Sequence, residues 1–192
     1  VLLRDVLNTV ATLREAKSVI YNGKVIVDGI IRKSLHHSIG LMDVIELQGI
    51  SDVYRLVPTH GHILQPIKID SSEKSKKIVK VTSKTTTKGK KTQLGFHDGR
   101  TIIADNNVNV GDSCLIQIPE QKILDVIKLE KDSLVIVTRG ANTGQIGHIN
   151  NINEATFTLP KRINLTVDKK KFEMPSDLVI VIGKEKPVIQ VR

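Results

Sequence analysis

Histidine, cysteine and acidic side chains are the residue types in this sequence that could support catalysis or bind a metal. His36-His37 and His60-Gly61-His62 lack companion ligands at the spacing of a metal site, so we reject metal binding for both. His97 precedes Asp98, but adjacent residues of a strand point to opposite faces, so this pair is expected to shape the turn before Gly99. The sequence holds no nucleophile-base-orienter set, phosphate-binding glycine loop or paired carboxylates. It therefore predicts no enzyme, no cofactor, no metal and no small-molecule substrate.

The single cysteine, Cys114, lies in an apolar run and can form neither an internal disulfide nor a cysteine-based zinc site. A chain with one cysteine and no internal disulfide fits a reducing compartment, where disulfides are rare. No apolar stretch has the length of a membrane span, and the opening residues 1–5 become charged too early for a secretory signal. We expect a cytoplasmic protein without a membrane partner. Because the chain begins in a helical pattern without methionine, we also expect an N-terminal segment to be missing.

Lysine is the residue type that points most directly to a partner. The formal net charge is +9, and residues 68–91 hold nine lysines against Asp70 and Glu73, which gives +7 in that stretch alone. Lysines on exposed strand edges can serve only to discourage aggregation. Nine in one stretch with few acids to pair them favour a polyanion, and nucleic acid first. Since the sequence has three Phe, two Tyr and no Trp, binding is expected to use phosphate contacts and shape rather than base stacking.

The elements that must position these side chains begin with a helix-hairpin unit. Apolar residues at helical spacing predict a short first helix that ends near Asn8 and Thr9, and Thr12-Leu13-Arg14-Glu15 is typical of a capping box that starts a second helix. Asn22-Gly23 is expected to end this helix. A hairpin with a two-residue turn is predicted over residues 25–32, and a strand over 41–47.

Short apolar runs separated by turn signals predict an all-β arrangement for the rest of the chain. Two strands are expected to flank Lys88-Gly89-Lys90-Lys91, which forms a cationic hairpin tip. A strand over 134–138 is followed by a glycine-containing loop that starts at Arg139. Further strands are expected at residues 155–159, 163–167 and 178–182, with Lys169-Lys170-Lys171 in a turn. The predicted fold class is α+β, mostly β.

Several of these segments together resemble a known ribosomal family. Residues 14–17, 23–29 and 40–45 look like the S-four RNA-binding module of the archaeal and eukaryotic small-subunit family S-four-E. Residues 86–89, 96–100 and 110–112 resemble its central domain, and residues 134–149 resemble a KOW motif set in an SH3-like barrel. The resemblance implies an S-four module over 1–48, a central β domain over 49–128 and a KOW barrel over 129–192. The resemblance also implies a basic segment before the module, which we expect to be missing from this chain.

The resemblance, taken with the charge, implies a set of RNA-binding residues. They are Arg14, Lys17, Lys24, Arg32 and Lys33 in the helix-hairpin unit, Lys84, Lys88, Lys90 and Lys91 in the lysine hairpin, and Arg139 and Asn142 in the KOW loop. Two alternatives stay open. Arg14 could instead pair with Glu15 or Asp28, and the lysines could simply be solvated.

We expect a structural constituent of the small ribosomal subunit, with small-subunit ribosomal RNA and neighbouring ribosomal proteins as partners. A KOW-type transcription elongation factor is one alternative, which would leave the S-four module unexplained. The other alternative is the RNA-delivery part of an RNA-modifying enzyme, which would need a separate catalytic domain.

Overall fold

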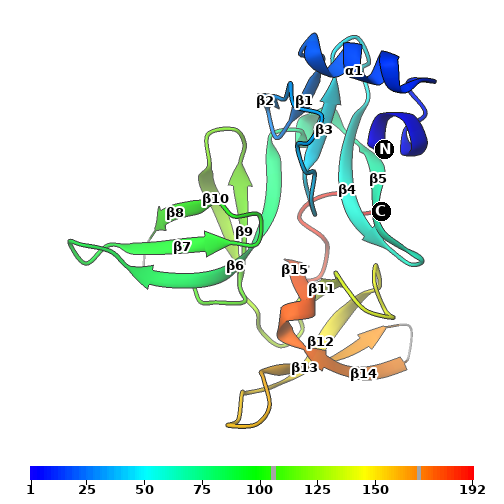
Figure 1. The fold of residues 1–192 in the computed structure, drawn as a ribbon. Helices are drawn as coiled ribbons and strands as arrows, with labels where there is room; N and C mark the ends of the chain where they lie inside the picture. The colour runs from blue at the N-terminus through cyan, green and yellow to red at the C-terminus, as the bar shows by residue number, and fades with distance from the viewer. Residues whose placement is uncertain (105–106, 168–169) are drawn as a thin grey trace.

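The computed structural model describes residues 1–104, 107–167 and 170–192 and shows three antiparallel five-stranded sheets in chain order (Figure 1). The first sheet has the order β2-β1-β3-β4-β5, the middle sheet β10-β9-β6-β7-β8 and the C-terminal sheet β14-β13-β12-β11-β15. The expectation of a mostly β chain is confirmed. The S-four and SH3-like assignments stay predictions.

Two helices precede the first sheet. The π-helix η1 (Leu2–Val6) ends shortly before Asn8, whose φ is 50°, so the chain leaves the helix close to the predicted end near Asn8 and Thr9. The helix α1 (Leu13–Tyr21) begins with the predicted capping box. Thr12 Oγ1 accepts from Glu15 N at 3.2 Å, and Glu15 Oε2 accepts from Thr12 N at 3.3 Å. These bonds satisfy amide groups that the first helical turn leaves without partners.

The first sheet contains β1 (Val25–Val27), β2 (Ile30–Ile31), β3 (Val44–Leu47), β4 (Val53–Thr59) and β5 (His62–Ile69). β1 and β2 form the predicted two-residue hairpin, with Val27 opposite Ile30. The strand expected over 41–47 begins only at Val44, because Met42 has a φ of 63° and Asp43 accepts from Gly40 N. β3 pairs with β4, so this sheet continues across residue 48. The three domain ranges stay a prediction.

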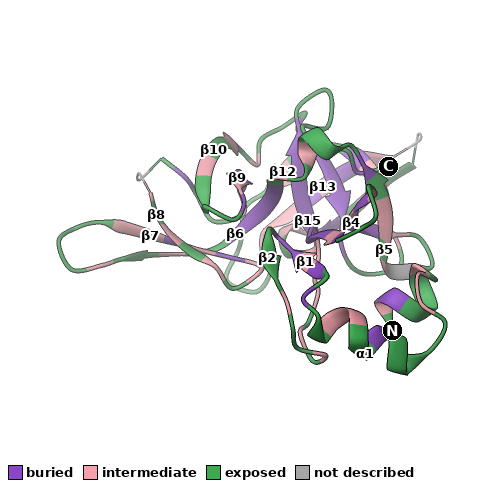
Figure 2. Cartoon of the chain, turned by 90° about the horizontal axis from the view of Figure 1, so that it is seen from above, coloured by how far each residue is buried: buried purple, intermediate pink, exposed green. Residues whose placement is uncertain are grey.

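The middle sheet contains β6 (Lys76–Thr86), β7 (Thr92–Phe96), β8 (Thr101–Ala104), β9 (Ser113–Gln117) and β10 (Lys122–Ile127). A short 3-10 helix η2 (Ser71–Glu73) leads into β6. β6 and β7 pair as far as Thr86 opposite Thr92, which confirms the predicted hairpin around the lysine-rich tip. Its far end is exposed and projects from the body of the molecule (Figures 1 and 2).

The C-terminal sheet contains β11 (Leu134–Val137), β12 (Ile146–Asn153), β13 (Arg162–Val167), β14 (Lys170–Pro175) and β15 (Val179–Gly183). A 3-10 helix η3 (Ser176–Leu178) precedes β15. The strand predicted over 155–159 is wrong, because Thr156 N donates to Leu159 O at 2.9 Å in a turn and Phe157 is fully exposed. Lys169, placed in a predicted turn, lies outside the described residues, and Lys170 and Lys171 begin β14.

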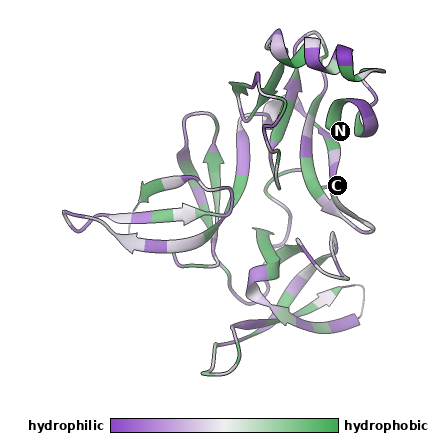
Figure 3. Cartoon of the chain, viewed as in Figure 1, coloured by the Kyte–Doolittle hydropathy of each residue, from purple (hydrophilic) through white to green (hydrophobic). Residues whose placement is uncertain are grey.

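The three sheets share buried apolar contacts where they meet. The largest core cluster is built on β11, β12, β13 and β15, and it includes Val57 of β4, Ile78 of β6 and Leu115 of β9. Buried residues gather at this junction in Figure 2, and β15 is hydrophobic along most of its length in Figure 3. Packing among the sheets therefore holds the three in one arrangement.

Candidate nucleic-acid interface

The lysine hairpin presents its cations at an ordered turn. The tip is closed by Thr87, whose backbone N and Oγ1 donate to Lys91 O at 2.8 and 3.0 Å. Lys88, Lys90 and Lys91 are exposed. Lys84 is half-buried on β6. Ammonium groups that stand out on a narrow hairpin can approach phosphates while little protein surface is buried.

The other lysines of residues 68–91 are not one surface, which corrects the interpretation drawn from charge counting. Lys77 is 1% exposed and Lys80 is 7% exposed. Lys68 lies 2.6 Å from Asp52, and Lys74 lies 3.5 Å from Glu46. Lys76 is exposed on β6. The polyanion surface predicted here is therefore concentrated at the hairpin tip.

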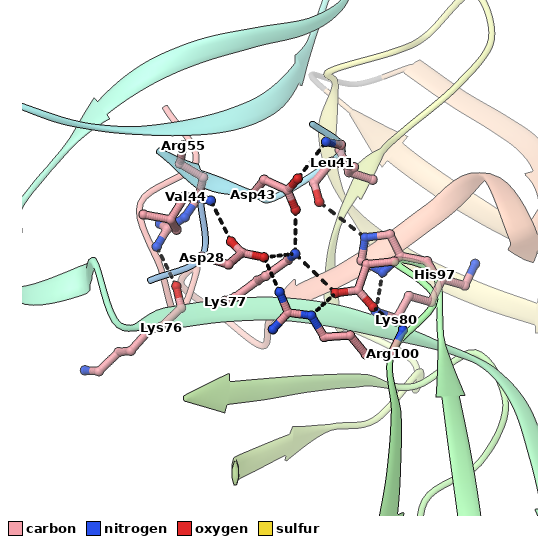
Figure 4. A network of polar contacts seen from close by, with 12 residues as sticks. Asp28, Leu41, Asp43, Val44, Arg55, Lys76, Lys77, Lys80, His97 and Arg100 are labelled. Carbon is pink, nitrogen blue, oxygen red and sulfur yellow. Dashed lines mark hydrogen bonds and ion pairs between the residues drawn. The ribbon is translucent and has the colours of Figure 1, made fainter. Parts of the chain in front are cut away.

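Lys77 is the centre of a buried ionic group that joins the first and middle sheets (Figure 4). Its Nζ lies 2.8 Å from Asp28 Oδ2, 2.5 Å from Asp43 Oδ1 and 3.2 Å from Asp98 Oδ2. Arg100 also pairs with Asp28, and its Nε lies 3.1 Å from Asp98 Oδ2. The carboxylates accept backbone amides as well: Asp28 from Val44 and Asp43 from Gly40.

Electrostatics favour the charged forms of Lys77 and Asp98 in this group. Burial works to lower the pKa of Lys77, but the attraction of Asp43 and Asp28 outweighs burial and raises the pKa above its usual value. For Asp98, burial works to raise the pKa, and the nearby Lys77 and Arg100 lower it below the usual range. Among the described residues, no group of three or more His, Cys, Asp or Glu is arranged to hold a metal ion. The ammonium of Lys77 occupies the point where the three carboxylates converge.

His97 lies beside this group and contacts the backbone of two different segments. Its Nδ1 accepts from Lys80 N at 3.1 Å, and its Nε2 lies 3.4 Å from Leu41 O. Burial lowers the pKa of His97, which favours the neutral ring. Gly99 N donates to Phe96 O at 3.1 Å, so the predicted turn role of this segment is confirmed.

Further polar contacts fix the sheets to one another, and the sequence analysis did not find them. The fully buried Arg55 of β4 donates to Glu73 Oε2 at 2.8 Å and to Gln190 O at 2.9 Å, which ties the C-terminal segment to the first sheet. Lys80 Nζ donates to Ser176 O at 2.7 Å. For Arg55 and Lys80 the sequence offered a signal, because each has apolar neighbours within its strand, whereas Lys77 directly follows the polar residues Ser75 and Lys76.

The predicted residues of the helix-hairpin unit divide by exposure. Arg14, Lys17, Lys24 and Lys33 are exposed, and Arg32 is half-buried. The alternative partners of Arg14 have other roles, because Glu15 completes the capping box and Asp28 contacts Lys77 and Arg100. The surface role of these cations stays a prediction.

The loop after β11 is held by its own bonds and by a neighbouring turn. Thr143 N and Oγ1 donate to Gly140 O at 3.2 and 2.5 Å, and Gly144 N donates to Val137 O. A Cβ at Gly144 would lie 2.6 Å from Thr59 Cα, so the loop packs directly on the turn between β4 and β5. Arg139 is exposed at the start of this loop, and Asn142 is half-buried.

A cleft of about 1320 Å³ opens where the three sheets meet. It brings together two residues that the sequence analysis placed in separate modules, Arg32 and Arg139. Four cations that were not predicted from the sequence also line it: Lys77, Lys80, Arg100 and Lys161. Lysines 88, 90 and 91 and Asn142 lie outside this lining.

A mostly β chain with an exposed lysine hairpin and a cation-lined cleft defines the class of candidate nucleic-acid-binding proteins. Residues 50–123 match the profile of ribosomal family S4e. The small ribosomal subunit protein eS4 of Methanothermobacter thermautotrophicus is 41% identical over 190 residues, covering 98% of this chain and 78% of the relative. The Korarchaeum cryptofilum protein of the same name is 38% identical over 192 residues, covering 100% and 80%.

A solved structure agrees with the sequence relatives. The crystal structure of the 30S ribosomal protein S4e from Thermoplasma acidophilum has a TM-score of 0.81 and 33% identity, covering 95% of this chain and 92% of the other. The chain belongs to ribosomal family S4e, in its archaeal form. Among the described residues, no helix is long and apolar enough to cross a membrane.

Proposed function

We propose that the chain is a structural, non-enzymatic constituent of the small ribosomal subunit that binds ribosomal RNA. The observation that carries this function is the match to archaeal eS4 proteins over nearly the whole chain. We place the protein on the cytoplasmic ribosome, with small-subunit ribosomal RNA and neighbouring ribosomal proteins as its partners. Neither the elongation-factor nor the enzyme alternative has support, because the relatives that span the chain carry the ribosomal name.

In the proposed mechanism, different parts of the chain supply affinity for RNA and selectivity among RNAs. The helix-hairpin unit, with Arg14, Lys17, Lys24 and Lys33 exposed, contacts folded RNA by shape, as in an S-four module. The lysine hairpin neutralises phosphates and supplies affinity that depends on salt. The loop with Arg139 and Asn142 adds a contact to RNA or to a neighbouring protein. Phosphate contacts position such a protein, and the fold of the RNA supplies the selectivity.

Salt dependence of RNA binding tests the role of the hairpin. Each phosphate contact changes the slope of log K against log salt by about 0.7 to 0.9. We expect Lys88→Ala with Lys90→Ala to flatten the slope for small-subunit RNA by about 1.4 to 1.8, because two exposed cations are lost. The measurement is a filter-binding or fluorescence titration at several salt concentrations.

The matched control removes the same charge from the same stretch. Lys68→Ala with Lys74→Ala deletes two lysines that lie beside Asp52 and Glu46, so the slope should change by less than half as much. Equal changes in the two double variants would mean that net charge, and not the hairpin, sets the affinity.

The assignment to the ribosome itself is tested by sedimentation, in which the tagged full chain should co-migrate with small subunits.

A further inference from the structure

The Nε of Arg32 has no hydrogen-bond partner among the residues that the structure describes. The residue follows β2 and is half-buried, yet its Nε is shielded from solvent. A buried donor without a partner is costly in a folded protein, and such groups are uncommon. Because the side chain lines the cleft between the sheets, a ligand in the cleft could supply the missing acceptor.

The charges that line the cleft leave a positive surplus. Of the described residues, six cations and four carboxylates line it. Three of the carboxylates belong to the group around Lys77 and Arg100, and the fourth, Asp177, lies beside the buried Lys80. Lys161 pairs with Glu154, which lies outside the lining. Among the described residues that line the cleft, Arg32 and Arg139 are therefore the two cations for which these contacts provide no carboxylate.

We propose that the cleft binds the phosphodiester backbone of one RNA segment, with Arg32 and Arg139 as its phosphate ligands. This inference rests on the proposed function and adds a site to it. A planar guanidinium matches the geometry of phosphate oxygens and binds them through two parallel hydrogen bonds. The cleft volume of about 1320 Å³ exceeds the usual range of roughly 300–1,000 Å³ for small-molecule pockets, which favours a chain segment over a small anion.

The cleft site forms only when the chain folds, because its two arginines come from segments that are distant in the sequence. Arg32 comes from the segment after β2, Arg139 from the loop after β11, and they are 107 positions apart in the chain (139 − 32). The group around Lys77 fixes the first sheet against the middle sheet, and Lys80 links the middle sheet to Ser176. RNA that enters the cleft would therefore touch elements of all three sheets at once.

Binding of Arg32→Gln and Arg139→Gln to a small-subunit RNA fragment tests the site. Each variant should weaken binding by about ten-fold or more, since a charge-assisted hydrogen bond to phosphate is lost. Lys122→Gln is the matched control, because this exposed lysine of β10 lies outside the cleft and carries the same charge. It should change binding by less than about three-fold. Arg32→Lys keeps the charge but loses the planar fork and should fall between wild type and Arg32→Gln.

Thermal unfolding of the free protein separates a ligand role from a structural one. Because Arg32 Nε has no partner among the described residues, Arg32→Gln should leave the melting temperature unchanged or raise it. A lowered melting temperature together with weaker binding would assign Arg32 to the fold and overturn the proposal.

Two further measurements complete the test. The first distinguishes RNA phosphates from a free phosphate anion, and the second distinguishes failure of the cleft proposal from failure of the proposed function. If millimolar pyrophosphate stabilises wild type but not Arg32→Gln, and RNA binding is equal in both, the cleft holds a free anion and the proposal is wrong. If wild type binds small-subunit RNA selectively and neither arginine variant weakens it, the cleft is not an RNA site, while the proposed function stands. If wild type does not prefer small-subunit RNA to random duplex, the proposed function fails, and the cleft proposal fails with it.

Discussion

At the scale of single residues, Lys77 shows how a charge that appears to belong to a binding surface can instead organise the interior. Water is excluded from its ammonium, and three carboxylates replace the lost hydration. Buried ion groups of this kind add little stability over an apolar core, but they are sensitive to the loss of one partner. Asp28 and Asp98, which lie in the turns between β1 and β2 and between β7 and β8, both contact this cation.

Replacing Lys77 by Met should lower the free energy of unfolding by about 3–5 kcal/mol, because Asp43 would lose its ion pair and Asp28 and Asp98 would keep only the one with Arg100. Lys76→Met is the control, since the neighbouring Lys76 is exposed, and it should change stability by less than about 0.5 kcal/mol. Denaturant unfolding measures both changes. Alkylation of Cys114 provides a second measurement, because this thiol is buried on β9 beside β6. Similar losses in the two variants would contradict the role given to Lys77.

At the scale of elements, the two loops that the sequence analysis assigned to RNA differ in kind. The lysine hairpin projects from the body, and bonds between Thr87 and Lys91 close its tip (Figure 1). The loop after β11 packs on the turn between β4 and β5 through Gly144. One element is therefore a projecting arm, and the other packs against the first sheet.

Gly144→Ala should destabilise the protein more than Gly140→Ala by about 1–3 kcal/mol. Both glycines have a positive φ, 80° and 95°, so an added Cβ strains the backbone at either site. Only at Gly144 would the Cβ also lie 2.6 Å from Thr59 Cα, whereas nothing lies within 4 Å at Gly140. Thermal unfolding of the two variants makes the comparison. Equal losses would mean that the loop does not depend on its contact with the β4–β5 turn.

At the scale of the whole molecule, the three sheets form one body before any RNA is bound. The Lys77 group, the Arg55 contacts with Glu73 and Gln190, and the Lys80 bond to Ser176 cross between segments that are distant in the chain. Shared apolar packing from Val57 and Ile78 accompanies them. RNA would therefore meet a fixed arrangement of cations, which reduces the ordering cost of binding.

The stability of the whole molecule should depend on pH through Lys80, whose pKa burial lowers from 10.5 to about 8. Below about pH 8 both states carry the proton, so the cost of the buried charge is fully present. Between about pH 8 and 10.5 the unfolded chain keeps the proton and the folded chain releases it, so stability rises with pH. The gain should be about 1 kcal/mol from pH 8 to 9.

Lys80→Met should lack this rise, and unfolding measured from pH 7.5 to 9 tests it. The window stops at pH 9 because burial raises the pKa of Cys114 from 9.0 to about 11, which works in the opposite direction above that pH. The raised pKa of Lys77 acts later still, since its contribution is lost only above its ordinary value of 10.5. A rise of equal size in the Lys80 variant would show that another group is responsible.

The sequence by itself determined the elements that depend on neighbours in the chain. The capping box at Thr12, the hairpin over 25–31 and the lysine hairpin follow from local hydrogen bonds, turn residues and alternation. Local patterning failed at residues 155–159, where apolar residues that alternate with threonines predicted a strand but Phe157 lies in an exposed turn. The apolar residues of a segment indicate a preference for strand structure. They do not indicate whether another strand is available to pair with that segment.

Only the tertiary structure decided which charges face solvent. Lys77 and Lys88 are the same residue type in the same stretch, yet one is buried among carboxylates and the other stands at a hairpin tip. The difference arises because Asp28 and Asp43 reach Lys77 from 49 and 34 residues away, across the contact between two sheets. The cleft with Arg32 and Arg139 has the same origin. Contacts of this range depend on how complete sheets pack, and no local pattern encodes them.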